Sequence, residues 1–177
     1  MNTPTSNRKG QLIVEAMIAL SVGATGILGI LGLLSRSLSL NRVVSDNYQA
    51  SLLAAEGVEI VKNILDTDQG GGGWNAWFPG PGWYTVDYTT NAATLAGNLI
   101  SPSSVFDCAS SGVSVKFDGT TGIYGYQNGE PTRFKRCVRI IEFPNERFQV
   151  NAVAAWSTRG GGEFSVNAED HFYRWRQ

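Results

Sequence analysis

The sequence predicts an α+β fold in which a long N-terminal helix packs on an antiparallel β-sheet head. Three observations support this class: an apolar run near the N-terminus, a pattern of helical period that follows it, and alternating segments in the second half. The chain has 177 residues, 42% hydrophobic and 16% charged, which leaves enough length for one small domain beyond the apolar run.

The apolar run covers residues 12–34 and contains one charged residue, Glu15. As a helix it would be about 34 Å long, more than the roughly 30 Å of hydrocarbon in a bilayer. We therefore predict that it spans a membrane. A carboxylate in such a segment costs on the order of 2.5–3.5 kcal/mol, so Glu15 needs a cationic partner or a functional reason to be there.

The start of the chain resembles the precursors of type IV pilins and pseudopilins, the type IV filament subunits. In that family a short basic leader ends in Gly, and Glu is the fifth residue of the apolar helix that follows. Here Gly10 ends a leader that contains Arg8 and Lys9, and Glu15 is the fifth residue counted from Gln11.

This resemblance implies that a prepilin peptidase cuts between Gly10 and Gln11 and methylates the new terminus at Gln11. It also implies a salt bridge between Glu15 and the terminal amine of a neighbouring subunit during assembly. The family usually has Phe where this chain has Gln11, so the resemblance implies cleavage more strongly than methylation.

The implied partners are other pilin subunits, the prepilin peptidase, an inner-membrane assembly platform and, before assembly, the lipid bilayer. The implied location is the cytoplasmic membrane, as a single-pass precursor with its head outside. The resemblance implies a minor subunit, which would then enter a surface pilus or the periplasmic pseudopilus of type II secretion.

The expected organisation is a leader over residues 1–10, a transmembrane and assembly segment over 11–34, an amphipathic helix over 35–66 and a globular, β-rich, extracytoplasmic head over 67–177. An ordinary signal peptide fits less well, since its apolar core would be about 7–15 residues long and an A-x-A-like site would follow. A plain single-pass anchor leaves Glu15 unexplained.

Glycines recur every three residues inside the apolar run, at Gly23, Gly26, Gly29 and Gly32. Small residues let membrane helices approach closely. The pattern indicates simple helix packing or no role at all, or else a segment that unwinds on leaving the bilayer.

Apolar residues continue at a spacing near 3.6 beyond residue 35, which predicts a helix lying on a core. The predicted buried face comprises Leu40, Val44, Tyr48, Leu52, Ala55, Val61 and Leu65. Gly57 is expected to mark a kink or a close contact, and the helix is expected to end before the glycine run 70–73.

The second half predicts antiparallel strands at residues 113–118, 122–127, 132–142, 147–157 and 163–166. Alternation in the fourth of these strands places one set of residues on a single, half-buried face: Phe148, Val150, Ala152, Ala154 and Trp156. Two cysteines, Cys108 and Cys137, would lie outside the cytoplasmic membrane, and a disulfide between them is predicted over two buried thiols.

Two segments are candidate partner surfaces. The aromatic segment 74–88, with Trp74, Trp77 and Trp83, either covers the core or presents a surface to a partner or carbohydrate. Alternation places Arg133, Lys135 and Arg139 on one face of a strand, where they would contact phosphates or guard an edge strand by charge. These features support an alternative function, a membrane-anchored extracytoplasmic binding or adhesion module for a surface, carbohydrate or DNA.

Catalysis finds little support in the sequence. The single histidine, His171, comes without a nucleophile motif and excludes a site with several histidines, and no Gly-Lys-Ser/Thr follows the glycine run at 70–73. A calcium loop beginning at Asp66 lacks the Glu of its twelfth position. We therefore expect no enzyme activity, catalytic residue, cofactor, metal or small-molecule substrate, and the net charge of −1 indicates no anionic partner.

Overall fold

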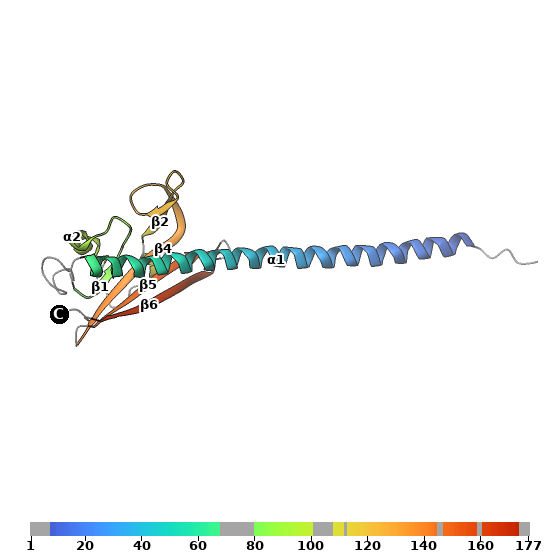
Figure 1. Cartoon of the computed structure of the whole chain (residues 1–177). Coiled ribbons are helices and arrows are strands. Elements are labelled where there is room, and N and C mark those ends of the chain that lie inside the picture. The colour runs from blue at the N-terminus through green and yellow to red at the C-terminus, as the bar shows by residue number, and fades with distance from the viewer. Residues whose placement is uncertain are drawn as a thin grey trace, which may run out of the picture. The chain divides into compact units, whose positions relative to one another are not determined.

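The computed structural model describes residues 8–67, 80–100, 108–111, 113–144, 147–158 and 161–173. Its contacts divide the chain into a first unit, Met1–Ser45, and a second unit, Asp46–Gln177. Helix α1 (Arg8–Thr67) contributes to both units (Figure 1). The predicted α+β class, a long helix packed on an antiparallel sheet, is confirmed.

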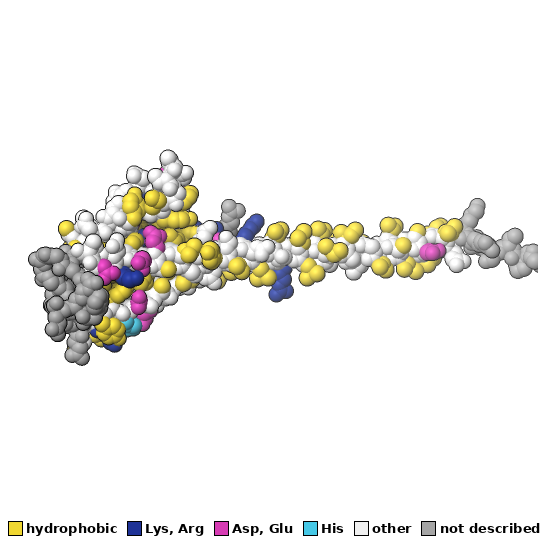
Figure 2. Space-filling model, viewed as in Figure 1, with side chains coloured by type: hydrophobic (Ala, Val, Ile, Leu, Met, Phe, Trp, Pro, Cys, Tyr) yellow, Lys and Arg dark blue, Asp and Glu magenta, His cyan; other side chains and the backbone are white. Residues whose placement is uncertain are grey.

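The first unit is described by the N-terminal part of α1. Every side chain from residue 10 to residue 45 is exposed, and hydrophobic side chains cover this part of the helix (Figure 2). The helix is long and apolar enough to cross a membrane. It is helical through Gly23 and Gly32, and apart from the adjoining helix no described atom lies within 4 Å of a Cβ built at either glycine.

The second unit is built on a sheet whose strands are all antiparallel. Along the chain the strands are β1 (Gly82–Tyr84), β2 (Ser114–Asp118), β3 (Ile123–Gly125), β4 (Glu130–Phe143), β5 (Arg147–Ser157) and β6 (Glu163–Tyr173). Their order is β3-β2-β4-β5-β6, and β1 pairs with β4 beside β2. Three short helices complete the described elements: α2 (Ala92–Leu95), η2 (Ala96–Asn98) and α3 (Cys108–Ser111).

The strand predictions hold for β2 to β5, and two differences appear at the margins. β6 continues to Tyr173, well past the predicted end at residue 166, because it pairs with β5 along its whole length, from Ser157↔Glu163 to Arg147↔Tyr173. β1 lies inside the aromatic segment and was not predicted, since a strand of 3 residues carries no readable alternation.

The core lies between one face of the sheet and the part of α1 that belongs to the second unit. The predicted inward face of β5 is confirmed, since Phe148, Val150 and Ala154 are fully buried. Two clusters fill this layer. One joins Val61 and Ile64 of α1 to β4 and β5, and the other joins Ala50, Leu53 and Ala54 of α1 to Phe134, Ala154 and Trp156.

The predicted buried face of α1 is wrong for five of its seven residues. Val61 and Leu65 are buried, but the other members are exposed: Leu40, Val44, Tyr48, Leu52 and Ala55. The buried face instead combines Leu53 and Ile64 with the small residues Ala50, Ala54 and Gly57, which let the helix backbone approach the sheet closely. A Cβ at Gly57 would lie 3.0 Å from Ala152 Cβ, so this glycine marks a close contact.

Candidate functional site

The candidate processing and assembly site lies in the first turns of α1. Gln11 and Glu15 are one helical turn apart and line the same side of the helix, together with Val14 and Ile18. All of these side chains are exposed. Hydrophobic side chains lie along this part of α1 (Figure 2). The arrangement places a carboxylate one turn from the residue that would become the N-terminus after a cut at Gly10.

Glu15 takes part in none of the ion pairs between described side chains. The side chains of Arg8 and Lys9 lie outside the described set. In lipid, an ionised carboxylate without a partner is costly, so this geometry suits a cation supplied at the same level of the helix.

The predicted disulfide is present. Cys108 of α3 is bonded to Cys137 of β4, with their Cα atoms 5.9 Å apart, and both residues are buried. A loop of about 30 residues closed in this way stabilises a fold by roughly 3–4 kcal/mol in the loop-entropy model. The bond holds α3 against the sheet, where Cys108 Sγ lies 3.6 Å from the carbonyl oxygen of Val153.

The three basic residues predicted to form a partner surface each contact another part of the second unit. Arg133 forms an ion pair with Asp46 of α1 (Nη2 to Oδ1, 2.7 Å). Lys135 Nζ donates a hydrogen bond of 2.6 Å to the carbonyl of Ala109. Arg139 lies over the ring of Trp83 at 5.7 Å from its centroid. The three side chains therefore stabilise the head's own structure.

Of the aromatic candidates, Trp74 and Trp77 lie outside the described residues. Trp83 is partly buried in β1. The neighbouring Tyr84 is almost fully buried, and its hydroxyl donates a hydrogen bond of 2.6 Å to the carbonyl of Gly80. At Tyr84, the aromatic segment therefore covers the core.

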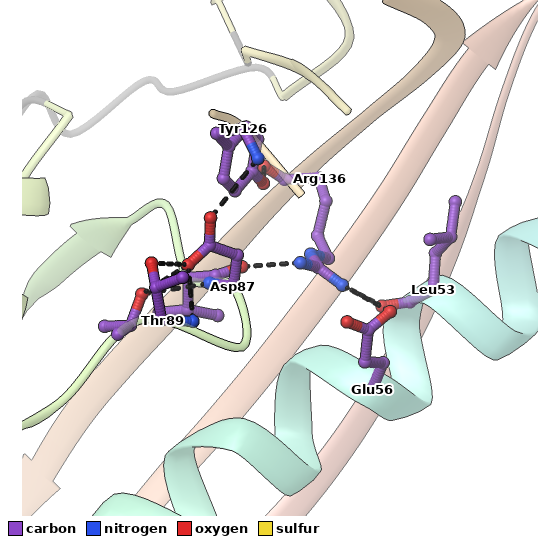
Figure 3. Close-up of polar contacts among 8 residues, drawn as sticks. Leu53, Glu56, Asp87, Thr89, Tyr126 and Arg136 are labelled. Carbon is purple, nitrogen blue, oxygen red and sulfur yellow. Dashed lines mark hydrogen bonds and ion pairs between the residues drawn. The ribbon is translucent and has the colours of Figure 1, made fainter. Parts of the chain in front are cut away.

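A buried arginine between α1 and β4 was not singled out from the sequence. Arg136 is completely buried and forms an ion pair with Glu56 of α1 (Nη1 to Oε2, 3.0 Å). It also donates hydrogen bonds to the carbonyls of Leu53 (3.3 Å) and Val86 (2.6 Å), as Figure 3 shows. The alternation of residues along β4 could have indicated this burial, because Arg136 lies on the same face of the strand as the buried Phe134.

Beside this arginine, Asp87 holds two chain segments together (Figure 3). Its carboxylate accepts hydrogen bonds from the Thr89 hydroxyl (2.6 Å) and backbone N–H (3.0 Å), and from the Tyr126 backbone N–H (3.2 Å). Burial alone would raise the pKa of Asp87, but the hydrogen bonds from Thr89, Tyr126 and Thr90 together hold it below its ordinary value.

The sheet carries one further polar cluster, on β5 and β6. Glu169 accepts a hydrogen bond from Asn151 Nδ2 at 2.6 Å, and its other oxygen lies 3.2 Å from His171 Nε2. The hydrogen bond from Asn151 is the main reason that the pKa of Glu169 is lowered. Within the described ranges, no group of three or more His, Cys, Asp or Glu is arranged to hold a metal ion.

We compared the chain with models of protein families, with curated proteins and with solved structures, and none of them matches it.

Proposed function

We propose that this chain is a subunit of a type IV filament, of the minor pilin or pseudopilin kind. It is made as a membrane-anchored precursor and cut between Gly10 and Gln11. The proposal rests on the spacing from Gly10 to Glu15 at the start of an exposed apolar helix. In the second unit, the end of the same helix packs on an antiparallel sheet.

The exposed apolar part of α1 supports both stages of this function. Exposed side chains such as Leu20, Leu28 and Leu33 need an environment without water, which a bilayer supplies first. A bundle of apolar helices from neighbouring subunits supplies it equally well, because membrane helices associate through close packing. Glu15 then gains a cationic partner from the terminal amine of a neighbouring subunit, which offsets the cost of burying its charge.

The disulfide of the second unit supports a location outside the cytoplasm, because such bonds persist in oxidising compartments. In this proposal the head lies outside the cytoplasmic membrane. The partners are other subunits, a prepilin peptidase and an assembly platform in the inner membrane. The alternative binding function receives less support, since Arg133 and Arg139 already contact Asp46 and Trp83.

The test is the intact mass of the protein purified from its native membrane. We expect a chain that begins at Gln11, with the terminus free or modified. Replacing Gly10 by Ser should leave a chain that begins at Met1, whereas the same change at Gly32, another exposed glycine of α1, should leave processing intact. A wild-type chain that still begins at Met1, in a cell that has the peptidase, would contradict the proposal.

A further inference from the structure

The residue that follows the proposed cut is a glutamine. This inference rests on the proposed function, because it concerns the terminus that cleavage after Gly10 creates. Gln11 is exposed on α1, and its side-chain amide has no hydrogen bond to any described residue. After the cut, one residue would carry both a free α-amine and an unengaged carboxamide.

We propose that Gln11 is a modification site at which the mature N-terminus closes to a pyroglutamyl ring. The uncharged α-nitrogen attacks the side-chain carbonyl carbon Cδ and forms the new N–Cδ bond. The bond from Cδ to Nε2 breaks, and the nitrogen leaves as ammonia with a proton from the amine. The product is a five-membered lactam, and the step needs no oxidant, reductant or second substrate.

The position of Gln11 in the helix leaves its α-nitrogen available for this step. The first four N–H groups of a helix have no carbonyl partner within it, so the new terminal nitrogen gives up no helical hydrogen bond on reaction. In the precursor the same nitrogen is part of the peptide bond to Gly10 and cannot attack. Cyclisation therefore follows cleavage and cannot precede it.

The surroundings of Gln11 favour the ring once it forms. Leu12 and Val14 begin the apolar run, where an ammonium group is costly and a neutral lactam is not. Glu15, one turn away on the same side, acts in the opposite direction, because its carboxylate attracts an ammonium group more strongly than a neutral lactam. Release of ammonia decides the outcome, because ammonia diffuses away and the reverse reaction lacks its nucleophile.

The ring changes what the subunit offers to its neighbours. A lactam nitrogen has no positive charge, so it forms no ion pair with a carboxylate and accepts no methyl group as an amine would. The subunit would still present Glu15 to the amine of one neighbour, but it would offer no amine in return. This asymmetry suits a subunit used in few copies rather than one repeated along a filament.

The experiment is intact-mass and N-terminal peptide mass spectrometry on the full chain from its native membrane, with a Gln11→Asn variant as the matched control. Wild type should be lighter by one ammonia than a chain beginning at Gln11, with the loss mapped to that residue, and its terminus should resist amine-reactive labelling. Gln11→Asn keeps an amide but would need a four-membered ring, so its terminus should be labelled. Gln11→Phe, with the residue usual in the resembling family, serves the same purpose if the Asn variant is cut poorly.

The outcomes separate this inference from the proposed function. A chain that begins at Gln11 with an intact amide, and with a free or methylated amine, would overturn the inference and leave the proposed function standing. A chain that begins at Met1 would overturn both. Equal loss of ammonia from a synthetic peptide beginning Gln-Leu-Ile, carried through the same purification, would also overturn the inference, because handling would then be its source.

Discussion

At the scale of single residues, Asp87 shows how the head compensates a buried charge. Asp87 is 3% exposed, yet its carboxylate is held by two N–H donors and the hydroxyls of Thr89 and Thr90. Hydrogen bonds of this kind stabilise the charged form, so the pKa of Asp87 lies below its ordinary value although burial acts against this. The group therefore stabilises the folded state only while it is ionised.

We expect the stability due to Asp87 to depend on pH in a defined direction. A carboxyl whose pKa is lower in the folded state than in the unfolded state stabilises the fold fully above about pH 4, its ordinary pKa, and the effect is lost as the pH falls through the folded value. Asp87→Asn should cost about 1–3 kcal/mol near neutral pH, because an N–H would then face the Tyr126 N–H. Denaturation of the detergent-solubilised chain from pH 7 to pH 3 measures the difference.

The difference in the free energy of unfolding between wild type and Asp87→Asn should become smaller below about pH 4. Asp66→Asn is the matched control, because Asp66 is exposed, and it should have little effect across the range. A difference that stays constant down to pH 3 would show that the Asp87 charge has no part in it.

At the scale of elements, α1 and β4 are joined through the buried ion pair of Glu56 and Arg136. The guanidinium is completely buried, whereas the Glu56 side chain is 35% exposed. Removing Glu56 leaves a buried positive charge beside two carbonyl groups and the ring of Tyr126, with no described anionic partner. Removing Arg136 leaves a carboxylate that water can reach. The two single substitutions should therefore lower the free energy of unfolding of the head by different amounts.

We expect Glu56→Ala to destabilise the head more than Arg136→Met does. Losing one partner of a buried pair costs about 3–5 kcal/mol, and the partial exposure of Glu56 places this pair toward the low end. The double variant should be more stable than Glu56→Ala alone, because no buried charge remains. Chemical denaturation of the four chains forms a double-mutant cycle, and additive costs would show that the two side chains are not coupled.

The elements differ in how far the sequence predicts them. β5 was predictable because alternating residues such as Val150 and Ala152 report a half-buried strand directly. The disulfide was predictable because the chain has only two cysteines, Cys108 and Cys137. The buried face of α1 was not, because Tyr48 and Leu52 make an equally regular apolar row on the side away from the sheet.

The buried polar contacts escaped sequence analysis for a different reason. The Asp87 carboxylate accepts a hydrogen bond from the backbone N–H of Tyr126, and the Arg136 guanidinium donates one to the carbonyl of Leu53. Each contact joins segments far apart in the chain, so no local spacing encodes it. Alternation predicts only the face of β4 on which Arg136 lies. Burial on that face was not expected, because arginine is rarely buried completely.

At the scale of the whole molecule, α1 serves two environments. In the second unit its small residues contact the sheet, whereas in the first unit its apolar side chains are exposed. Side chains exposed in this way contribute nothing to the core of the head. Any effect of a substitution in the exposed part should therefore appear in membrane retention or in assembly, and the unfolding of the head should stay unchanged.

Replacement of Glu15 by Leu distinguishes an assembly subunit from a plain anchor, because only an assembly subunit should lose its place in the filament fraction. Removing a carboxylate from the apolar run lowers the cost of insertion by about 2.5–3.5 kcal/mol, so a plain anchor should be retained in the membrane at least as well as wild type. An assembly subunit should also be retained, but it should be lost from the sheared filament fraction, since no carboxylate remains to pair with an amine. Immunoblots of the membrane and filament fractions measure both effects.

Ser21→Leu is the control for this experiment, since Ser21 is an exposed polar residue of the same run whose hydroxyl bonds only to the carbonyl of Met17 in its own helix. It should change neither fraction. Normal recovery of the Glu15→Leu chain in filaments would mean that the carboxylate has no part in assembly. Loss from filaments together with full membrane retention would locate the function of Glu15 between subunits, because nothing within the single chain would then have suffered from its removal.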